Sequence, residues 1–179
     1  HSVFSGTCGS LGAAILCSDP NSSIIGGLTI GNTYFVRVYT WTSTGGQNTT
    51  FDICVGTPPP PPANDDCSGA IGLTVNPNQS CGTTTSGTVA WATASVDANS
   101  CAGTDDDDVW YSFVATNTTH YIDLQNVSGF TDMYHAVYSG TCGSFGAAID
   151  CSDPNSSTLT GLTEGNTYFE RVYTYTGTG

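Results

Sequence analysis

The sequence predicts an all-β fold of antiparallel β-sandwich repeats joined by a proline-rich linker. Three observations lead to this prediction: the 179-residue chain repeats itself after 134 residues, its apolar residues alternate with a period of two, and five consecutive prolines separate the copies. Residues that favour pleated strands are common, with 28 Thr, 9 Tyr and 7 Phe. The helix formers Lys, Glu and Met total only three residues, so long helices are not expected.

The repeat aligns residues 1–45 with residues 135–179 without a gap, and 34 of these 45 positions are identical. Most differences are mild, but Val36 of the first copy is Glu170 in the second. We expect this position to face solvent, or a neighbour that differs between the copies.

The repeat divides the chain into three parts. Residues 1–57 are the C-terminal part of one repeat, residues 58–62 are the linker, and residues 63–179 are the next repeat without its final strand. Five prolines favour a semi-rigid polyproline II spacer of roughly 15 Å. We expect the sequence to be a window on a periodic protein, either a tandem array or copies that assemble head to tail.

Strands are predicted wherever apolar residues alternate between two faces, as they do in residues 34–41. Clusters of Gly, Asn, Asp and Ser separate such runs at the spacing of a β-sandwich, which predicts eight or nine strands per repeat. The other predicted strands are residues 49–55, 70–75, 83–93, 109–115, 119–127 and 133–139.

Charge and composition exclude several classes of function. With no Lys, two Arg and a formal net charge of −13, the chain lacks the basic surface that nucleic-acid partners require. No run approaches the ~18 apolar residues of a membrane span, so membrane insertion is not expected. Motifs of hydrolases and metalloproteases are absent, and clustered loop acids do not resemble the separated carboxylate pair of a glycosidase. We therefore expect no enzymatic activity.

Eight cysteines without a CxxC motif favour disulfides, and hence an extracellular or cell-surface location. The nine-residue spacing of Cys8 and Cys17 recurs in the second copy and predicts a local bridge in each. The expected pairs are Cys8–Cys17, Cys142–Cys151 and Cys81–Cys101. Cys54 and Cys67 remain: they either bridge the linker, or Cys67 joins the counterpart of Cys54 in its own unit.

Four segments resemble a known family, namely residues 63–71, 107–115, 137–143 and 161–173. They are similar to repeat modules of secreted Bacteroidetes-type proteins and look like a cysteine-bearing relative of the bacterial pre-peptidase C-terminal domain. The resemblance implies a jelly-roll or immunoglobulin-like β-sandwich, often calcium-binding, in exported enzymes, adhesins or long surface proteins. The sequence departs from that pattern in having two tandem copies and no adjoining peptidase.

Acidic residues gather before two of the predicted strands, and the resemblance implies that these groups lie near each other. Calcium prefers six to eight oxygen ligands, so we expect one or two Ca²⁺ sites; the alternative is a solvated acidic loop. The candidate ligands are Asn64, Asp65, Asp66, Asp105, Asp106, Asp107, Asp108 and Asp132.

Each copy has one arginine, Arg37 or Arg171, in a chain without lysine. We expect a specific carboxylate or a stacked aromatic as its partner, in a structural role rather than a ligand-binding one. Aromatic residues follow each arginine and line either a sugar-binding face or a core: Tyr39, Trp41, Tyr173 and Tyr175.

The leading hypothesis is a non-enzymatic structural repeat of an extracellular filament or long surface adhesin, whose partners are other copies of the same repeat. In this hypothesis copies assemble head to tail and are stabilised by disulfides and calcium. The segment expected to add to a neighbouring copy comprises Thr49, Thr50, Phe51, Asp52, Ile53, Cys54 and Val55. The alternative is a carbohydrate- or protein-binding accessory module of a secreted enzyme. Glycosylation sequons begin at Asn21, Asn48, Asn78, Asn117, Asn126 and Asn155.

Overall fold

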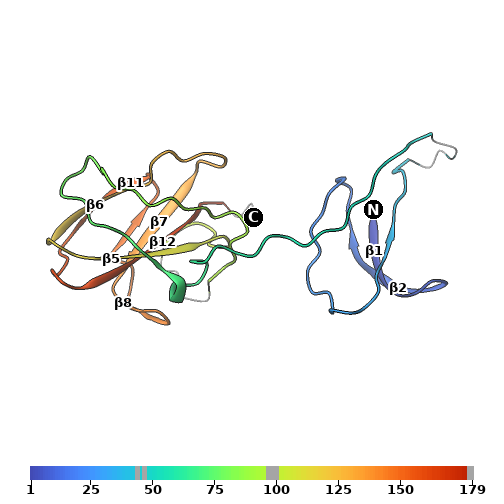
Figure 1. Cartoon of the computed structure of the whole chain (residues 1–179), viewed down its shortest axis with the longest axis horizontal. Helices are drawn as coiled ribbons and strands as arrows, with labels where there is room; N and C mark the ends of the chain where they lie inside the picture. The colour runs from blue at the N-terminus through green and yellow to red at the C-terminus, as the bar shows by residue number, and fades with distance from the viewer. Residues whose placement is uncertain (43–44, 46–47, 96–100, 177–179) are drawn as a thin grey trace. The chain divides into compact units, whose positions relative to one another are not determined.

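A computed structural model describes residues 1–42, 45, 48–95 and 101–176. The chain divides into two compact units, His1–Pro58 and Pro59–Gly179, with the division inside the proline run (Figure 1). We refer to them as the first and the second unit and describe each by itself.

The first unit contains a three-stranded antiparallel sheet in the order β2-β1-β3. Its strands are β1 (Ser2–Thr7), β2 (Ser10–Cys17) and β3 (Phe35–Arg37). Gly6 has a positive φ of 106°, and a Cβ there would lie 2.6 Å from the Ser10 carbonyl oxygen, so the hairpin requires glycine at this position. Of its described residues only Ser2 and Val3 are buried, so this unit has almost no core of its own.

The second unit is built around a five-stranded sheet in the order β10-β7-β12-β5-β4. All pairings in it are antiparallel except the short parallel contact between β4 and β5. A 3-10 helix, η1 (Cys67–Gly69), leads into the sheet. The strands are β4 (Ile71–Gly72), β5 (Val109–Val114), β7 (Met133–Tyr138), β10 (Asp150–Ser152) and β12 (Thr167–Thr174).

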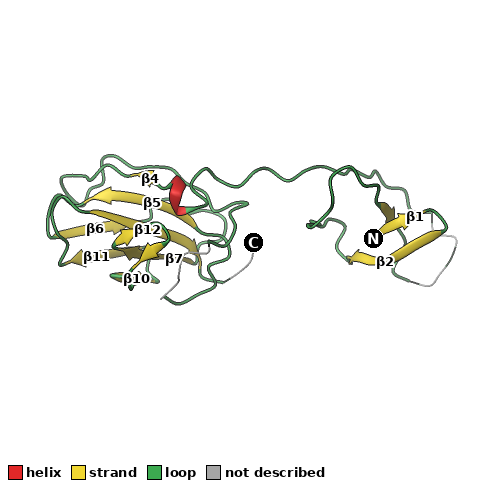
Figure 2. Cartoon of the chain, turned by 90° about the horizontal axis from the view of Figure 1, so that it is seen from below, coloured by secondary structure: helices red, strands yellow, loops and turns green. Residues whose placement is uncertain are grey.

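Two further strand pairs complete the second unit, giving nine strands among its described residues (Figure 2). The antiparallel pair β6 (Thr119–Asp123) and β11 (Ser156–Thr160) forms a second small sheet. The hairpin of β8 (Gly140–Thr141) and β9 (Ser144–Phe145) is the other pair.

The hydrophobic core lies between the five-stranded sheet and the β6–β11 pair. Phe113, Val137 and Tyr168 project from the sheet, and Leu159 of β11 and Ile122 of β6 pack against them. We call this side of the sheet the core face. Burial of each large apolar side chain stabilises the fold by roughly 1.5–3 kcal/mol.

The opposite side of the sheet, which we call the aromatic face, is covered by loops and the β8–β9 hairpin. Phe145 of the hairpin stacks on Trp110 with ring centroids 5.2 Å apart, and contacts Tyr138 and Phe169. The two faces alternate along β5, β7 and β12, as the period-two pattern of the sequence predicts.

Two disulfides hold these coverings on the aromatic face: Cys67–Cys142 and Cys101–Cys151. The predicted pairs Cys142–Cys151 and Cys81–Cys101 are therefore wrong. The β8–β9 hairpin places Cys142 next to Cys67 of η1, beyond Trp110. Cys151 lies on β10, opposite Ala136 of β7, so the two cysteines have different partners.

The predicted Cys8–Cys17 bridge is also wrong, because both thiols are free and exposed. They are the counterparts of Cys142 and Cys151, which bond to distant residues rather than to each other. Cys67 bonds to Cys142, so it bridges neither the linker nor a counterpart of Cys54.

The strands predicted over residues 109–115, 119–127 and 133–139 are confirmed as β5, β6 and β7. Residues 49–55 and 83–93 form no strand. Both runs have strand-like patterns, but an isolated strand leaves its backbone groups unpaired, and among the described residues neither run has a neighbouring strand to pair with.

Of the two expected alternatives, exposure to solvent does not hold for Glu170, since only 2% of it is exposed. It lies on the core face opposite Tyr111 of β5 and Val137 of β7. Its counterpart Val36 is exposed in the first unit. At this repeat position the acidic residue is therefore buried and the apolar residue exposed, the reverse of what is usual.

The two disulfides should account for a large part of the stability of the second unit. They join residues 75 and 50 positions apart, and cross-links of this length contribute about 4 kcal/mol each in the chain-entropy model. We expect the Cys67→Ser/Cys142→Ser double variant to lower the free energy of unfolding in urea by about 2–4 kcal/mol. Cys81→Ser, which removes a free thiol, should cause little change. Peptide mass spectrometry that finds Cys142 joined to Cys151 would contradict this pairing.

Candidate functional site

One end of the five-stranded sheet collects most of the acidic candidates, because β5 and β7 begin there and β12 ends there. Asp105 to Asp108 directly precede β5, and Asp132 directly precedes β7. Tyr175, just after β12, links the loops: its N–H donates to the Asp132 carbonyl (2.9 Å), and its carbonyl accepts from the Thr104 N–H (3.0 Å). We call this region the sheet end.

Asp108 is fully buried and accepts hydrogen bonds from three donors. Its carboxylate accepts from Arg171 Nε at 3.0 Å, from the Ser95 N–H at 2.8 Å and from the Ser95 hydroxyl. The Trp110 indole N–H in turn donates to Ser95 Oγ at 2.8 Å. This carboxylate therefore ties β12 to the loop that covers the aromatic face.

Arg171 is fully buried and has the partners that the sequence predicted, a carboxylate and stacked aromatics. Asp105 Oδ2 lies 2.6 Å from its Nη1, and the guanidinium lies 5.5 Å from the ring centres of both Trp110 and Tyr173. Burial lowers the pKa of Arg171, but the hydrogen bond and charge of Asp108 and the charge of Asp105 outweigh it, so the net shift is upward. The cation persists at any physiological pH.

The remaining ligand candidates are also bound within the protein or point to solvent. Asp107 accepts from the N–H and hydroxyl of Thr174 at 2.9 and 2.8 Å. Asp65 accepts from the N–H and hydroxyl of Thr93 at 2.6 and 2.7 Å. Asp66, Asp106 and Asp132 are exposed.

Asn64 is buried and exchanges hydrogen bonds with Trp110: its side-chain amide donates to the Trp110 carbonyl at 2.9 Å and its carbonyl accepts the Trp110 N–H at 2.8 Å. The two acidic groups therefore do lie near each other, as the resemblance implied. They do not converge on one point, however: within the described residues no three His, Cys, Asp or Glu side chains are grouped as a metal site requires.

Aromatic rings occupy the same sheet end. Tyr134 lies between Tyr173 and Tyr175, with ring centroids 5.4 and 5.8 Å away. The Tyr173 hydroxyl donates to the Ala102 carbonyl at 2.7 Å, and burial, followed by the neighbouring tyrosines, raises its pKa. Tyr175 is 36% exposed, which makes it the accessible ring of this group.

Gly103 allows the loop to approach Tyr175 closely. Its φ is +91°, and a Cβ there would lie 3.1 Å from the Tyr175 ring and 3.0 Å from its carbonyl oxygen. Backbone hydrogen bonds on both sides of Tyr175 and the packing of its ring on Tyr134 hold this residue against the two loops that carry the exposed Asp106 and Asp132.

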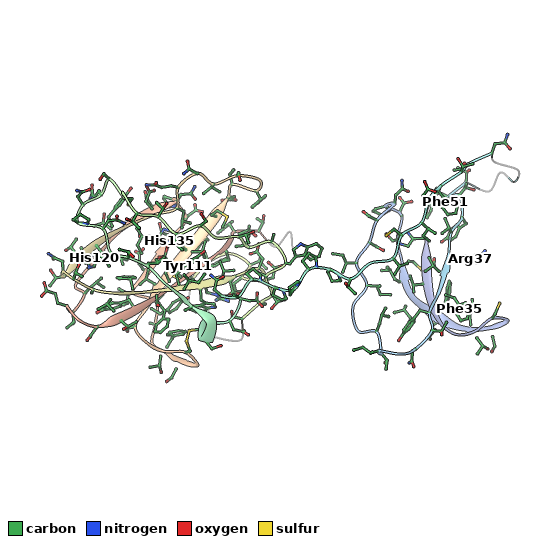
Figure 3. All side chains as sticks on the ribbon, in the orientation of Figure 1. Phe35, Arg37, Phe51, Tyr111, His120 and His135 are labelled. Carbon is green, nitrogen blue, oxygen red and sulfur yellow. A yellow bond between two sulfur atoms is a disulfide. The ribbon has the colours of Figure 1, made fainter. Side chains whose placement is uncertain are left out.

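The buried pair His135 and Glu170 was missed by the sequence reasoning. His135, labelled in Figure 3, lies on the core face with its Nδ1 3.4 Å from Glu170 Oε1, and both residues are almost fully buried. Burial raises the pKa of nearby Tyr111, while a hydrogen bond with Asn64 lowers it and the charge of Glu170 raises it. Strand alternation was the available signal, because it places both residues on the face that carries Val137 and Val172.

His120 is the remaining histidine of the second unit and has a local structural role. Its Nε2 accepts the backbone N–H groups of Thr116 and Asn117 at 3.1 and 3.2 Å, and its ring packs edge-on against Phe113. It therefore stabilises the turn before β6.

Arg171 and Arg37 occupy the same repeat position in very different surroundings, which gives a matched test. Arg171→Met leaves Asp108 buried without its cation, and breaking such a pair typically costs about 3–5 kcal/mol. Arg37 is exposed over the Tyr39 ring, 5.3 Å away, so Arg37→Met should change stability by less than about 1 kcal/mol. Urea unfolding of both variants checks this; equal losses would contradict the central role of the buried pair.

No helix among the described residues is long and apolar enough to span a membrane.

Comparison with curated proteins and with solved structures gives no match. Residues 63–178, well over half of the chain, match the model of a family described as galactose binding domain-like and associated with type IX secretion. That association, together with the disulfides, makes this a secreted, extracellular or cell-surface protein, and confirms the expected likeness to modules of secreted Bacteroidetes-type proteins. The chain belongs to the type IX secretion-associated, galactose-binding domain-like family, whose fold is a β-sandwich.

Proposed function

We propose that the second unit is a non-catalytic carbohydrate-binding module of an exported protein, and that the sheet end around Tyr175 is its binding surface. The observation that carries the proposal is a partly exposed aromatic ring, packed on Tyr134 and bonded through its backbone to two loops with exposed carboxylates, in a chain of the galactose-binding domain-like family.

The chemistry of the sheet end suits a sugar. The apolar face of a pyranose ring packs on an aromatic side chain, and its hydroxyls donate hydrogen bonds to carboxylates. Tyr175 offers the ring, and Asp106 and Asp132 offer exposed acceptors on the two loops bonded to its backbone. Because the ring is already ordered, little conformational entropy is lost on binding.

The repeat supports an aromatic residue in this role. The first copy has Trp41 at the position of Tyr175, and 81% of Trp41 is exposed. Two aromatic platforms in one chain suit a polymeric glycan, since linked weak sites gain avidity.

The chain is proposed to lack catalytic activity because the histidines and the buried acids of the second unit are engaged within the fold. His135 and Glu170 are buried in the core, Asp107 and Asp108 are bound to Thr174 and Arg171, and His120 holds a turn. These engagements leave the sheet end suited to binding rather than to proton transfer.

Tyr175→Ala tests the binding surface. We expect it to weaken binding to galactose-containing oligosaccharides about tenfold or more, which corresponds to about 1.4 kcal/mol and is within the range of one aromatic contact. Tyr175→Phe should keep most of the affinity. Isothermal titration calorimetry after a glycan-array screen measures both.

The matched control is Val114→Ala, which removes exposed apolar surface at the opposite end of β5. It should leave binding unchanged. Wild-type protein that binds no glycan on the array, or a Tyr175→Ala variant that binds normally, would overturn the proposal.

A second candidate function is the structural one, a repeat of a filament or long adhesin formed by jelly-roll or immunoglobulin-like sandwiches with a proline-rich linker between them. The 34 identical positions between the two copies favour it, because a recently duplicated unit is typical of repeat arrays. A full-length sequence with many such copies and no catalytic domain would support this function over an accessory module.

Calcium binding stays a prediction of the sequence, and the exposed carboxylates of Asp106 and Asp132 are its remaining donors at the sheet end. An ion that binds only the folded state raises the melting temperature. The prediction is therefore a melting temperature several degrees higher in millimolar calcium than in EDTA, with the increase lost in Asp106→Asn. Asp19→Asn in the first unit is the control, and identical melting curves in calcium and EDTA would exclude the site.

A further inference from the structure

The sheet end is acidic and offers a ligand no arginine or lysine. Residues 59–179 contain 13 of the chain's 15 acidic residues but only one Arg and no Lys. The arginine is Arg171, which is 0% exposed and lies 2.6 and 3.0 Å from the carboxylates of Asp105 and Asp108. Its charge is therefore buried and offset by two acids. A negatively charged ligand beside Tyr175 would find no guanidinium or ammonium to pair with.

The Tyr175 ring suits a cation as well as a sugar. The face of an aromatic ring is electronegative and attracts an ammonium group within about 6 Å of its centre. Tyr175 is 36% exposed, and its ring packs on that of Tyr134 at 5.8 Å between centroids. The described surface next to this ring thus has two features that favour positive charge, an electronegative ring face and carboxylates.

The carboxylates lie on the two loops that hold Tyr175. Asp132 accepts the Tyr175 N–H through its carbonyl, and its side chain belongs to an exposed residue. Thr104, whose N–H donates to the Tyr175 carbonyl, precedes the exposed Asp106 by two positions. Carboxylates alone attract any small cation, whereas the ring adds affinity for an ammonium that is attached to an apolar frame.

The same charges oppose anionic glycans. A uronate or a sulfated sugar bound at this surface would place its charge beside like charges, with no exposed cation to compensate. Juxtaposed like charges weaken a wrong complex, and specificity often depends on such repulsion as much as on attraction. The charge of the sheet end therefore separates three classes of glycan, namely cationic, neutral and anionic ones.

We propose that the sheet end prefers sugars with a free amine, such as galactosamine, over neutral sugars, and neutral sugars over anionic ones. Asp106 and Asp132 determine this preference, while the apolar face of the pyranose packs on Tyr175. The inference rests on the proposed function of this surface and specifies the charge class of its ligand.

The test titrates the full 179-residue chain with methyl glycosides of galactose, galactosamine, N-acetylgalactosamine and galacturonic acid. The NMR signal of the Tyr175 N–H reports binding at this site. EDTA removes calcium as a competitor, and about pH 6 keeps the sugar amine protonated. We expect galactosamine to bind about three- to tenfold more tightly than its uncharged N-acetyl form, the range of one or two exposed ion pairs and a cation–π contact. Galacturonic acid should bind at least about threefold more weakly than galactose.

Substitutions locate the preference. Asp106→Asn and Asp132→Asn should each lower the ratio of galactosamine to galactose affinity about twofold, and the double variant should bring it close to one. The amide keeps a hydrogen-bonding oxygen, so galactose affinity should change less. Glu164→Gln is the matched control, because it removes the same charge from an exposed position in the turn before β12, at the other end of the sheet. It should leave the ratio unchanged, whereas raised salt should lower it in every protein that shows the preference.

The outcomes separate this inference from the proposed function. Equal affinities for galactosamine and its N-acetyl form, tighter binding of galacturonic acid, or an equal effect of Glu164→Gln would overturn the inference while sugars still bind at Tyr175. Ethanolamine, an amine without a pyranose, should bind at least about fivefold more weakly than galactosamine, and equal binding would mean a general cation site instead. A Tyr175 signal that responds to none of the glycosides would overturn both the inference and the proposed function.

Discussion

The buried ion pair between Arg171 and Asp108 is the interaction on which the second unit depends. It lies on the face of the sheet where Trp110, Tyr173 and the two disulfides also lie, and it joins the central strand β12 to the loop that precedes β5. A buried charge is costly without a partner, so β12 reaches its final environment only when the acidic loop is in place. The four consecutive acids are therefore mainly a structural device: two hold Arg171, and a third binds Thr174.

The first unit presents the same strand sequence in other surroundings. Arg37, Tyr39 and Trp41 occupy the repeat positions of Arg171, Tyr173 and Tyr175. Arg37 then lies over Tyr39 at the surface, and the sheet around it has only three strands. The local sequence therefore determines which residues form strands, whereas the burial of the arginine depends on elements that are distant from it in the chain.

This division explains what sequence reasoning could and could not reach. Alternation predicted β5, β6 and β7, and the single arginine per repeat predicted its carboxylate and aromatic partners, because these signals are local or chemically specific. The cysteine spacing predicted the wrong disulfides. The short distance between Cys142 and Cys151 along the chain does not reveal that a hairpin places Cys142 beyond Trp110, next to Cys67. The burial of Glu170 could not be chosen between the two alternatives, because a single acidic residue in a strand is normally solvated and its partner His135 lies on another strand. The eight oxygen donors were recognised as a cluster, yet their hydrogen bonds to Thr93, Ser95, Trp110 and Thr174 could not be read from their order.

The two disulfides are interleaved along the chain, since Cys101 lies between Cys67 and Cys142, and Cys151 lies beyond both. Under a mechanical load applied along the polypeptide, residues 67–151 therefore form one covalently closed block that lengthens very little. Only the segments outside the block, which include β11 and β12, are free to unravel under tension. A molecule exposed at a cell surface to fluid shear would therefore lengthen very little until a strand outside the block detaches. β12, which Arg171 anchors, is the strand whose detachment resists the force.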